Sequence, residues 1–370
     1  MSIGIIGGGP GGLTLARVLR VNGVDAVVYE RDASRAARSQ GGSLDLHPET
    51  GQRALRLAGL EAEFLAMARP EGQDQRLLDQ TGTVLLRQDV PDDVPMLRPE
   101  VDRADLRDVL LDSLPGAVVW GREFEQATPL PDGGWRAHFA DGGTADHDLI
   151  VGADGVWSRV RPLVTEARPR HSGVNYVEGV IPDPDPSLAA RLGRGSYMAL
   201  GEGQIVSTQR VRDGSYRVSF TVQTPEDWLS TVPFDDPAKV RAVLMDLFAG
   251  WAPELLALAD ACVGGFEGRS LHLLPVGVTW ASVPGVTLVG DAAHLMPPVG
   301  EGANHAMLDG AELALALAGG DQDEAVKQYE TAMFERTAAV ARRTTKIFEM
   351  LLAPDGAQRL LAFFTGHAEK

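Results

Sequence analysis

A glycine-rich turn near the N-terminus constrains the fold of this chain more than any other feature. An apolar run over Ile3–Ile6 leads into the spacing Gly7-x-Gly9-x-x-Gly12, and apolar residues then recur with helical spacing up to residue 19. A second apolar run ends at Glu30. This order predicts a strand, a tight turn, a helix and a second strand. The free N–H groups at the start of such a helix favour a pyrophosphate.

Glu30 is the second residue expected to contact the nucleotide, after the glycine turn that faces the pyrophosphate. A carboxylate at the end of the second strand can accept hydrogen bonds from an adenosine ribose. Its negative charge would repel a 2′-phosphate, so we expect a nucleotide that lacks one. The alternative is an ordinary glycine turn followed by a solvated glutamate.

The 370 residues exceed one typical domain, and their apolar patterns change along the chain. Helical spacing predicts helices over 47–60, 106–114, 237–262, 302–317 and 322–350, while 173–223 carries short alternating strands. This mixture predicts an α/β fold with a β-rich part inserted into a nucleotide-binding part. The expected nucleotide-binding domain comprises 1–70, 99–165 and 275–335, the β-rich domain comprises 71–98 and 166–274, and 336–370 forms a C-terminal helical segment.

The net charge and the cysteine content indicate which binding partners and which cellular compartment to expect. The net charge of −17 disfavours nucleic acid and anionic membranes as partners. The single Cys262 cannot form an intrachain disulfide, no cysteines and histidines have zinc-site spacing, and no apolar run approaches the ~20 residues of a membrane span. We therefore expect a cytoplasmic protein, monomeric and without a metal ion.

Two later segments each carry an apolar strand into a turn of glycine and aspartate. The first covers residues 148–161 (DLIVGADGVWSRVR), and the second covers 286–304 (VTLVGDAAHLMPPVGEGAN). The second continues through Pro297-Pro298 to a helix expected to begin near Gly302. Together with the first turn, these segments place three strand-end turns in one chain.

The three turns resemble the dinucleotide fingerprint, the Asp-Gly motif and the Gly-Asp motif of class A FAD-dependent monooxygenases, the p-hydroxybenzoate hydroxylase family. They span residues 4 to about 310, most of the chain. Shorter segments are similar to the tetracycline-inactivating monooxygenases: 29–31 (YER), 41–47 (GGSLDLH), 51–52 (GQ), 58–60 (AGL), 103–107 (RADLR) and 224–228 (TPEDW). The resemblance implies a doubly wound FAD-binding domain of the GR2 Rossmann-like type, an inserted β-rich substrate domain and a C-terminal helix.

The same resemblance implies tightly bound FAD. The Asp291 carboxylate can bind ribityl hydroxyls, and the helix from Gly302 can direct amides at the flavin edge that becomes negative on reduction. Arg38 and Arg103 are expected to compensate the diphosphate, and Asp45 is expected to face the flavin. The full set of expected cofactor residues is Gly7, Gly9, Gly12, Glu30, Arg31, Arg38, Asp45, Arg103, Asp154, Asp291, Pro298, Gly302, Ala303 and Asn304.

No second glycine fingerprint opens a helix, so NAD(P)H is expected to dock only transiently. The resemblance implies a cycle in which NAD(P)H reduces FAD, dioxygen forms a C4a-hydroperoxyflavin, and one oxygen hydroxylates an aromatic or polycyclic small molecule. The catalytic residues stay unassigned, because His294 and His305 beside the flavin loop are expected to be structural. The alternatives are an FAD-dependent reductase or dehydrogenase without oxygen transfer, and a non-catalytic flavin-binding protein.

The expected strand over 216–223 alternates apolar and polar residues, so one face packs and the other meets solvent or a cavity. We expect Arg217 and Ser219, with Tyr197 and Met198 of a neighbouring strand, to line the substrate cavity. Here the chain departs from the tetracycline-inactivating pattern, because Arg217 replaces a histidine and Glu301 replaces the usual glutamine. The substrate of those enzymes is therefore not implied.

Overall fold

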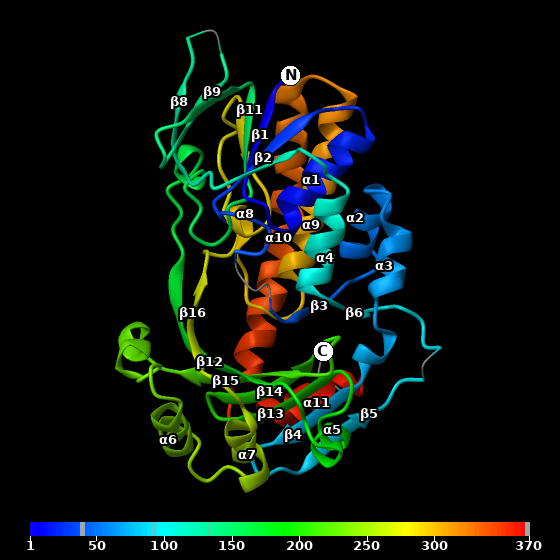
Figure 1. Cartoon of the computed structure of the whole chain (residues 1–370), viewed down its shortest axis with the longest axis vertical. Coiled ribbons are helices and arrows are strands. Elements are labelled where there is room, and N and C mark those ends of the chain that lie inside the picture. The colour runs from blue at the N-terminus through cyan, green and yellow to red at the C-terminus, as the bar shows by residue number, and fades with distance from the viewer. Residues whose placement is uncertain (38–40, 92, 132, 367–370) are drawn as a thin grey trace. The chain divides into compact units, whose positions relative to one another are not determined.

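The computed structural model describes residues 1–37, 41–91, 93–131 and 133–366 (Figure 1). It divides into two compact units. Unit 1 comprises Met1–Ala68, Arg103–Arg170 and Leu273–Thr345, and unit 2 comprises Arg69–Asp102, His171–His272 and Lys346–Lys370. The segment expected to be a separate C-terminal part thus falls in both units, because one long helix crosses the boundary at Thr345.

The elements of unit 1 are β1 (Ile3–Ile6), α1 (Pro10–Val21), β2 (Ala26–Glu30), β3 (Ser43–Asp45), α2 (Gly51–Leu57), α3 (Glu61–Met67), α4 (Arg103–Asp112), β7 (Val118–Trp120), β8 (Phe124–Pro129), β9 (Trp135–Phe139), β10 (Thr144–His147), β11 (Leu149–Gly152), η2 (Arg161–Leu163), β17 (Val286–Leu288), α8 (Asp291–His294), α9 (Gly302–Gly319) and most of α10 (Gln322–Leu351). Those of unit 2 are η1 (Pro70–Gln73), β4 (Gln75–Asp79), β5 (Val84–Gln88), β6 (Glu100–Asp102), β12 (Arg170–Ile181), α5 (Pro186–Leu192), β13 (Ser196–Gly201), β14 (Gln204–Arg210), β15 (Tyr216–Gln223), η3 (Glu226–Thr231), α6 (Pro237–Leu247), α7 (Pro253–Ala261), β16 (Glu267–Leu273) and α11 (Gly356–Phe364).

A parallel sheet forms the centre of unit 1, in the strand order β17-β11-β1-β2-β7. Every neighbouring pair in this sheet is parallel, so the carboxyl ends of the strands share one edge. β1 and β11 are buried along their whole length, which explains their continuous apolar sequences. The turns that follow β1, β11 and β17 therefore meet at this edge, although they are far apart in the sequence.

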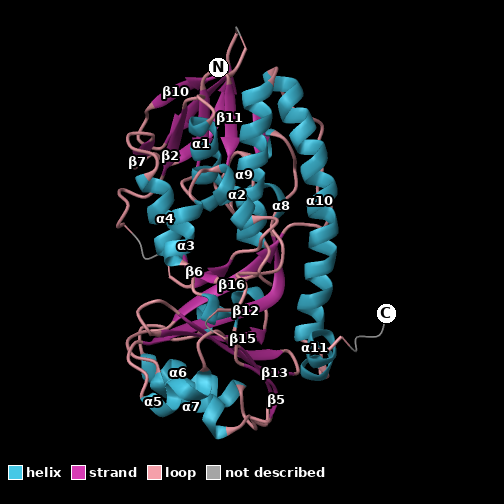
Figure 2. Ribbon diagram, turned by 90° about the vertical axis from the view of Figure 1, so that its right-hand side faces the viewer, coloured by secondary structure: helices cyan, strands magenta, loops and turns pink. Residues whose placement is uncertain are grey.

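Close helix packing brings α9 against this edge. A Cβ on Gly11 of α1 would lie 2.8 Å from the Ala306 carbonyl oxygen, and one on Gly310 of α9 would lie 2.4 Å from the Gly11 carbonyl oxygen. Glycines on both helices thus permit backbone contact between α1 and α9. Figure 2 shows α10 running beside α9.

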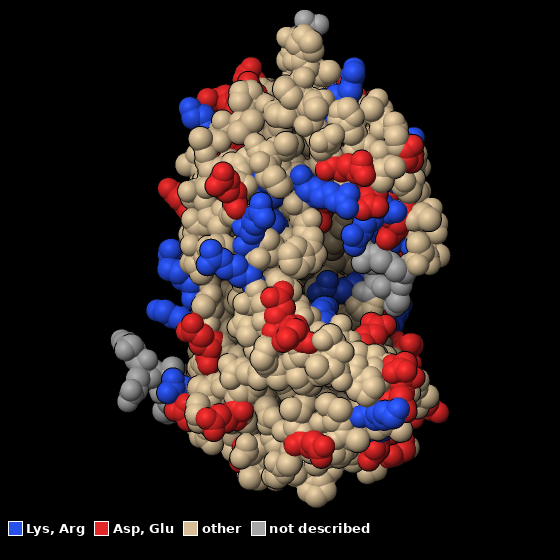
Figure 3. Space-filling model, turned by 90° about the vertical axis from the view of Figure 1, so that its left-hand side faces the viewer, with Lys and Arg blue, Asp and Glu red and all other residues tan. Residues whose placement is uncertain are grey.

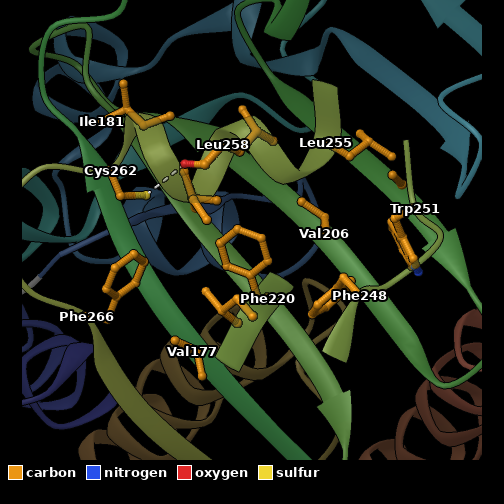
Figure 4. Close-up of a cluster of buried hydrophobic side chains, with 14 of the residues drawn as sticks. Val177, Ile181, Val206, Phe220, Phe248, Trp251, Leu255, Leu258, Cys262 and Phe266 are labelled. Atoms are coloured by element: carbon orange, nitrogen blue, oxygen red, sulfur yellow. Dashed lines mark hydrogen bonds between the residues drawn. The ribbon is translucent and has the colours of Figure 1, made fainter. Parts of the chain in front are cut away.

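A seven-stranded mixed sheet forms unit 2, in the order β16-β12-β15-β14-β13-β4-β5. One face carries the apolar core with α6 and α7, in which Phe220 packs edge-on against Phe248 at a centroid distance of 5.6 Å. Figure 4 shows these side chains with Trp251 and Leu258, and the buried Cys262 thiol donates to the Leu258 carbonyl oxygen at 3.2 Å. The expected α/β fold with a β-rich insertion is confirmed.

Two expected helices differ from the structure. The helix expected over 237–262 is two helices, since Gly250 has a left-handed φ of +89° and Pro253 starts α7. The helix expected over 47–60 begins only at Gly51. The N–H groups of His47 and Gly51 are instead bonded to Asn304, 257 and 253 residues away in the sequence.

On the face drawn in Figure 3, acidic and basic side chains are interspersed. Many arginines of the chain are paired with carboxylates, such as Arg136 with Asp146 at 2.6 Å in unit 1. These exposed pairs contribute little stability each.

Candidate cofactor site and substrate face

The first glycine turn joins β1 to α1. Glycine is needed at its three motif positions for different physical reasons. Gly7 has a φ of +112°, and a Cβ there would lie 2.3 Å from the Ala153 carbonyl oxygen. A Cβ on Gly12 would lie 2.2 Å from the Gly7 carbonyl oxygen. A Cβ on Gly9, by contrast, would meet open space at the N-terminus of α1. Packing explains Gly7 and Gly12, whereas Gly9 leaves room beside a helix end that favours anions.

Glu30 lies at the end of β2 and holds this turn. Its side chain is buried and accepts a hydrogen bond from Gly8 N–H at 2.8 Å through one oxygen and from Asp32 N–H at 3.0 Å through the other. Each carboxylate oxygen has a second lone pair for an external donor. Arg31, the next residue, is exposed, and Arg38 lies outside the described residues.

The Asp-Gly turn after β11 is tied to the Gly-Asp turn after β17 by Arg161, which ends the Asp-Gly segment but was given no role from the sequence. Arg161 is buried and donates to the carbonyl oxygens of Asp291 at 3.0 Å and Ala292 at 2.7 Å, and also to Val156 at 2.9 Å. Asp154 accepts from the N–H groups of the turn that follows it, including Arg159 at 2.8 Å. Asp154 thus shapes its own turn.

Charges from separate segments gather around Asp291. Burial raises the pKa of this carboxyl, and the charges of His294, Arg103 and Arg161 oppose that rise. Arg103 comes from the start of α4, where it is exposed and donates its N–H to Gly42 at 3.1 Å. A Cβ on Gly302 would lie 3.8 Å from Asp291 Oδ1, so the N-terminus of α9 lies beside this carboxylate. The structure therefore brings Arg103, Asp291 and Gly302 together.

Asn304 organises the loops at the N-terminus of α9. Its Oδ1 accepts from His47 N–H at 2.9 Å, Gly51 N–H at 3.1 Å and the Thr50 hydroxyl at 3.1 Å. Its Nδ2 donates to the carbonyl oxygens of Asp45 at 2.7 Å and Gly300 at 2.9 Å. Both amide hydrogens are used by the protein. Asn304 therefore positions the loops around the site.

The remaining expected residues of this loop differ in exposure. Pro298 is exposed, while Gly302 and Ala303 are half-buried at the start of α9. The Asp45 carboxylate lies next to Gly300, where an added Cβ would approach it to 3.0 Å, and it contacts His47 Nε2 at 3.0 Å.

Glu301 precedes α9 and has basic side chains on three sides. It pairs with Arg343 of α10, and its Oε2 lies 3.5 Å from His305 Nε2 and 3.7 Å from His47 Nδ1. The hydrogen bond from His305 and the charges of His47 and Arg343 hold the pKa of Glu301 below its usual value. The replacement of the usual glutamine thus places an ionised group here.

The four expected substrate residues do not share one face of the unit 2 sheet. Met198 is paired with Ser207, and Ser207 with Ser219, so these side chains lie on the same face, and Arg217 lies two residues from Ser219 on that face. Tyr197 points to the opposite face, where it is 2% exposed within the apolar core. The grouping of Tyr197 with the other three is therefore wrong, because adjacent residues of a strand point in opposite directions.

Arg217 differs from most arginines of the chain. It is half-buried, and it makes no hydrogen bond or ion pair with any residue that the structure describes. Its cross-strand partner is Gln209, on the same polar face as Ser219. Hydrogen bonds from Ser215 and the charge of Arg217 lower the pKa of the exposed Asp213, so Arg217 interacts with this carboxylate through its charge but is not hydrogen-bonded to it.

Neither a membrane nor a metal site is indicated by the described part of the chain. None of its helices combines the length and apolarity needed to cross a bilayer. Within the same residues, no three His, Cys, Asp or Glu side chains are grouped to hold a metal ion.

Comparison with known proteins agrees with the geometry of unit 1. Residues 1–227 and 278–346 match a family model described as an FAD binding domain. The chain is 32% identical over 374 residues to the monooxygenase asqM of Emericella nidulans, covering 85% of this chain and 83% of that protein. It is 31% identical over 371 residues to a 3-amino-4-hydroxybenzoate 2-monooxygenase of Streptomyces cremeus, covering 96% and 89%.

Solved structures share the fold. Klebsiella pneumoniae HpxO complexed with FAD and uric acid matches with a TM-score of 0.82 at 24% identity, covering 100% of this chain and 93% of that one. The tetracycline destructase Tet(51) matches with a TM-score of 0.72 at 20% identity, covering 99% and 97%. The resemblance inferred from the three turns is thereby confirmed. This chain belongs to the FAD binding domain family and is an FAD-dependent monooxygenase of class A.

Proposed function

We propose that this chain uses NAD(P)H and dioxygen to hydroxylate an aromatic or polycyclic small molecule. The observation that carries the proposal is the meeting of three strand-end turns at one edge of the unit 1 sheet. The names of relatives support an aromatic substrate, since one acts on 3-amino-4-hydroxybenzoate. FAD, when bound, supplies the redox centre that NAD(P)H reduces and at which dioxygen is activated.

The residues of unit 1 fit FAD. Gly9 leaves open space at the N-terminus of α1 for a pyrophosphate, and Glu30 keeps free lone pairs for ribose hydroxyls. Asp291 is half-buried, with the charges of Arg103 and Arg161 nearby, so its carboxyl oxygens can accept hydrogen bonds from sugar hydroxyls. We propose that Arg31 and Arg38 add positive charge near the phosphates, and that Asn304 acts by holding the loop of Asp45 in place.

We further propose that Met198, Arg217 and Ser219 contact the substrate. The support is their common face and the missing ion-pair partner of Arg217 among the described residues. An arginine that is not hydrogen-bonded to a carboxylate can pair with an anionic group on the substrate, such as a carboxylate or a phenolate.

The proposal is tested by three measurements on the purified chain. We expect uptake of FAD with the absorption of bound flavin, NAD(P)H oxidation that accelerates with a suitable aromatic acid, and incorporation of one atom of labelled dioxygen into the product. Turnover without labelled product would support a reductase or dehydrogenase instead. Flavin binding without NAD(P)H consumption across a broad aromatic panel would support a non-catalytic protein.

The expectation of a cytoplasmic monomer stays a prediction. Cell fractionation and size-exclusion chromatography test it.

A further inference from the structure

Glu178 and Arg217 lie on the same polar face of the unit 2 sheet, on neighbouring strands. Figure 1 shows β16, β12 and β15 side by side, in the order that their hydrogen bonds give. Glu178 of β12 is paired with Ser219 of β15, and Arg217 lies two residues before Ser219. Opposed residues of antiparallel strands point to the same face. Glu178 and Arg217 are therefore diagonal neighbours on the face proposed to meet the substrate.

An ion pair between these two side chains would be expected from their positions alone. Diagonal neighbours in a sheet lie roughly 7–8 Å apart, which long side chains can bridge. Their opposite charges attract each other. Yet Arg217 forms no ion pair with Glu178 or with any other residue that the structure describes. A different contact therefore holds the Glu178 carboxylate.

Arg269 of the edge strand β16 makes this contact. Its Nη2 donates to Glu178 Oε1 at 2.6 Å. The same guanidinium lies over the ring of Tyr176, 5.6 Å from the ring centroid. Tyr176 is two residues before Glu178 on β12, so it shares the polar face. Arg269 thus holds Glu178 from the β16 side of β12, whereas Arg217 lies on its β15 side.

Other carboxylates around Arg217 also have partners of their own. Asp213 accepts from the Ser215 N–H at 2.9 Å. Gln209, which is the cross-strand partner of Arg217, donates to Glu100 Oε2 at 3.1 Å. Local bonds thus occupy the carboxylates, while the half-buried Arg217 guanidinium is left without a hydrogen-bonded one.

We propose that Arg269 is a positioning residue that keeps Glu178 away from Arg217, so that Arg217 stays available for the anionic group of an aromatic acid. The inference rests on the proposed function, because it concerns the substrate contact assigned there to Arg217. Without Arg269, the Glu178 carboxylate would be released to pair with Arg217. The substrate would then have to displace that carboxylate before it could bind.

The test compares two ligands of the FAD-loaded protein. One is the aromatic acid that wild type binds best, with 3-amino-4-hydroxybenzoate as the first probe, and the other is the neutral carboxamide of the same acid. The change in flavin absorption during titration gives both dissociation constants. We expect Arg269→Gln to weaken binding of the acid about fivefold, on the scale of a partly exposed ion pair, and to leave binding of the carboxamide unchanged. A merely structural role of Arg269 would weaken both.

Removal of the competing carboxylate is the decisive variant. In Arg269→Gln combined with Glu178→Gln nothing competes for Arg217, so we expect binding of the acid to return to the wild-type value. Arg269→Lys keeps the charge that holds Glu178, and we expect it to retain acid binding. Lys239→Gln is the matched control, because it removes another ion-paired cation of unit 2, on the helix α6 that packs on the apolar face. We expect it to bind the acid as wild type does.

Arg217→Gln separates failure of this inference from failure of the proposed function. If Arg217→Gln weakens acid binding but Arg269→Gln does not, the inference is overturned while the proposed function stands. The same holds if Arg269→Gln weakens both ligands equally, or if Glu178→Gln does not restore binding. Wild-type protein that takes up FAD but binds no aromatic acid, or Arg217→Gln that binds the acid as wild type does, contradicts the proposed substrate contact itself.

The Arg269 side chain is 65% exposed, so we expect its variants to fold. If Arg269→Gln does not fold, Tyr176→Leu decides, since it removes the ring over which the guanidinium lies. We expect weaker binding of the acid alone in that variant, and binding equal to wild type overturns the inference.

Discussion

Unit 1 and unit 2 place functional residues in two different ways. In unit 1 the expected cofactor residues lie in turns at the ends of parallel strands, and several of them, such as Gly7 and Gly12, also hold the turn together. In unit 2 the proposed substrate residues alternate with core residues along the same strands, as Arg217 and Ser219 do with Val218 and Phe220. In unit 1 the same residues therefore stabilise the fold and line the expected cofactor site. In unit 2 the residues that stabilise the fold lie on one face of the sheet, and the proposed substrate residues lie on the other.

The core face of unit 2 provides the largest expected effect. Phe220→Ala removes a fully buried ring from the cluster with Phe248, and we expect unit 2 to lose about 3–5 kcal/mol of unfolding free energy. Denaturant unfolding measures the loss, with Ser219→Ala on the opposite face as control, which should change stability by less than about 0.5 kcal/mol. Equal losses in both variants would contradict the separation of the two faces.

The glycine turn of unit 1 allows scaffold and site to be separated by substitution. Gly12→Ala forces a Cβ against the Gly7 carbonyl oxygen, and we expect a loss of about 1–3 kcal/mol in the protein without FAD. Gly9→Ala meets open space, so we expect unchanged stability without FAD but at least about tenfold weaker FAD binding. Thermal unfolding and FAD titration of both variants measure this, and unaltered FAD affinity in Gly9→Ala would contradict a pyrophosphate at that place.

Arg217 tests the polar face of the unit 2 sheet. Arg217→Gln removes a charge that has no bonded partner among the described residues, so we expect little change in stability and a rise of about tenfold in KM for an anionic aromatic substrate. Arg191→Gln, at an exposed arginine of α5, matches the change in net charge. An equal rise in KM for both variants would show a general charge effect in place of a contact.

The smallest effect concerns two buried tyrosines on the core face. The Tyr197 hydroxyl is buried without a hydrogen-bond partner among the described residues, whereas the Tyr216 hydroxyl donates to the Gly193 carbonyl oxygen at 2.5 Å. Tyr216→Phe should therefore cost about 0.5–1.5 kcal/mol of stability, and Tyr197→Phe should be neutral or slightly stabilising. Neither should alter KM, and a KM effect limited to Tyr197→Phe would restore its place among the substrate residues.

Local patterns predicted the elements well where one pattern decides the conformation. The strand over 216–223 is β15 with the expected alternation of buried residues, and the helix expected near Gly302 begins there. The prediction was wrong at residues 47–50, because the helix begins only at Gly51, where Asn304 accepts the free Gly51 N–H at the helix start, and the His47 N–H also binds Asn304. It was also wrong in grouping Tyr197 with Met198, although the strand period of two argues against that grouping.

Some residues of the cofactor site could not be predicted from local sequence patterns either. Arg161, Asp309 and Arg336 tie the cofactor turns together, yet the sequence assigned a role to none of them, because each acts through a partner from a distant segment. Arg161 ends the Asp-Gly segment, whereas Asp309 and Arg336 lie in no short motif. Asp309 follows Gly290 by 19 residues, and Arg336 follows Asp309 by 27. Sequence spacing of that size carries no geometric signal, since the intervening loops and helices set the distance.

The sequence by itself determined the order of strands and helices, the family and the three glycine turns, because glycine spacing and apolar periodicity act within a few residues. Only the tertiary structure decided which charges surround Asp291 and that Asn304 holds the neighbouring loops by hydrogen bonds to their backbone. It also decided that Arg217 lies on the polar face of the unit 2 sheet without a hydrogen-bonded carboxylate. These properties depend on burial and on contacts between segments far apart in the chain, and those exist only once the sheets and helices have packed.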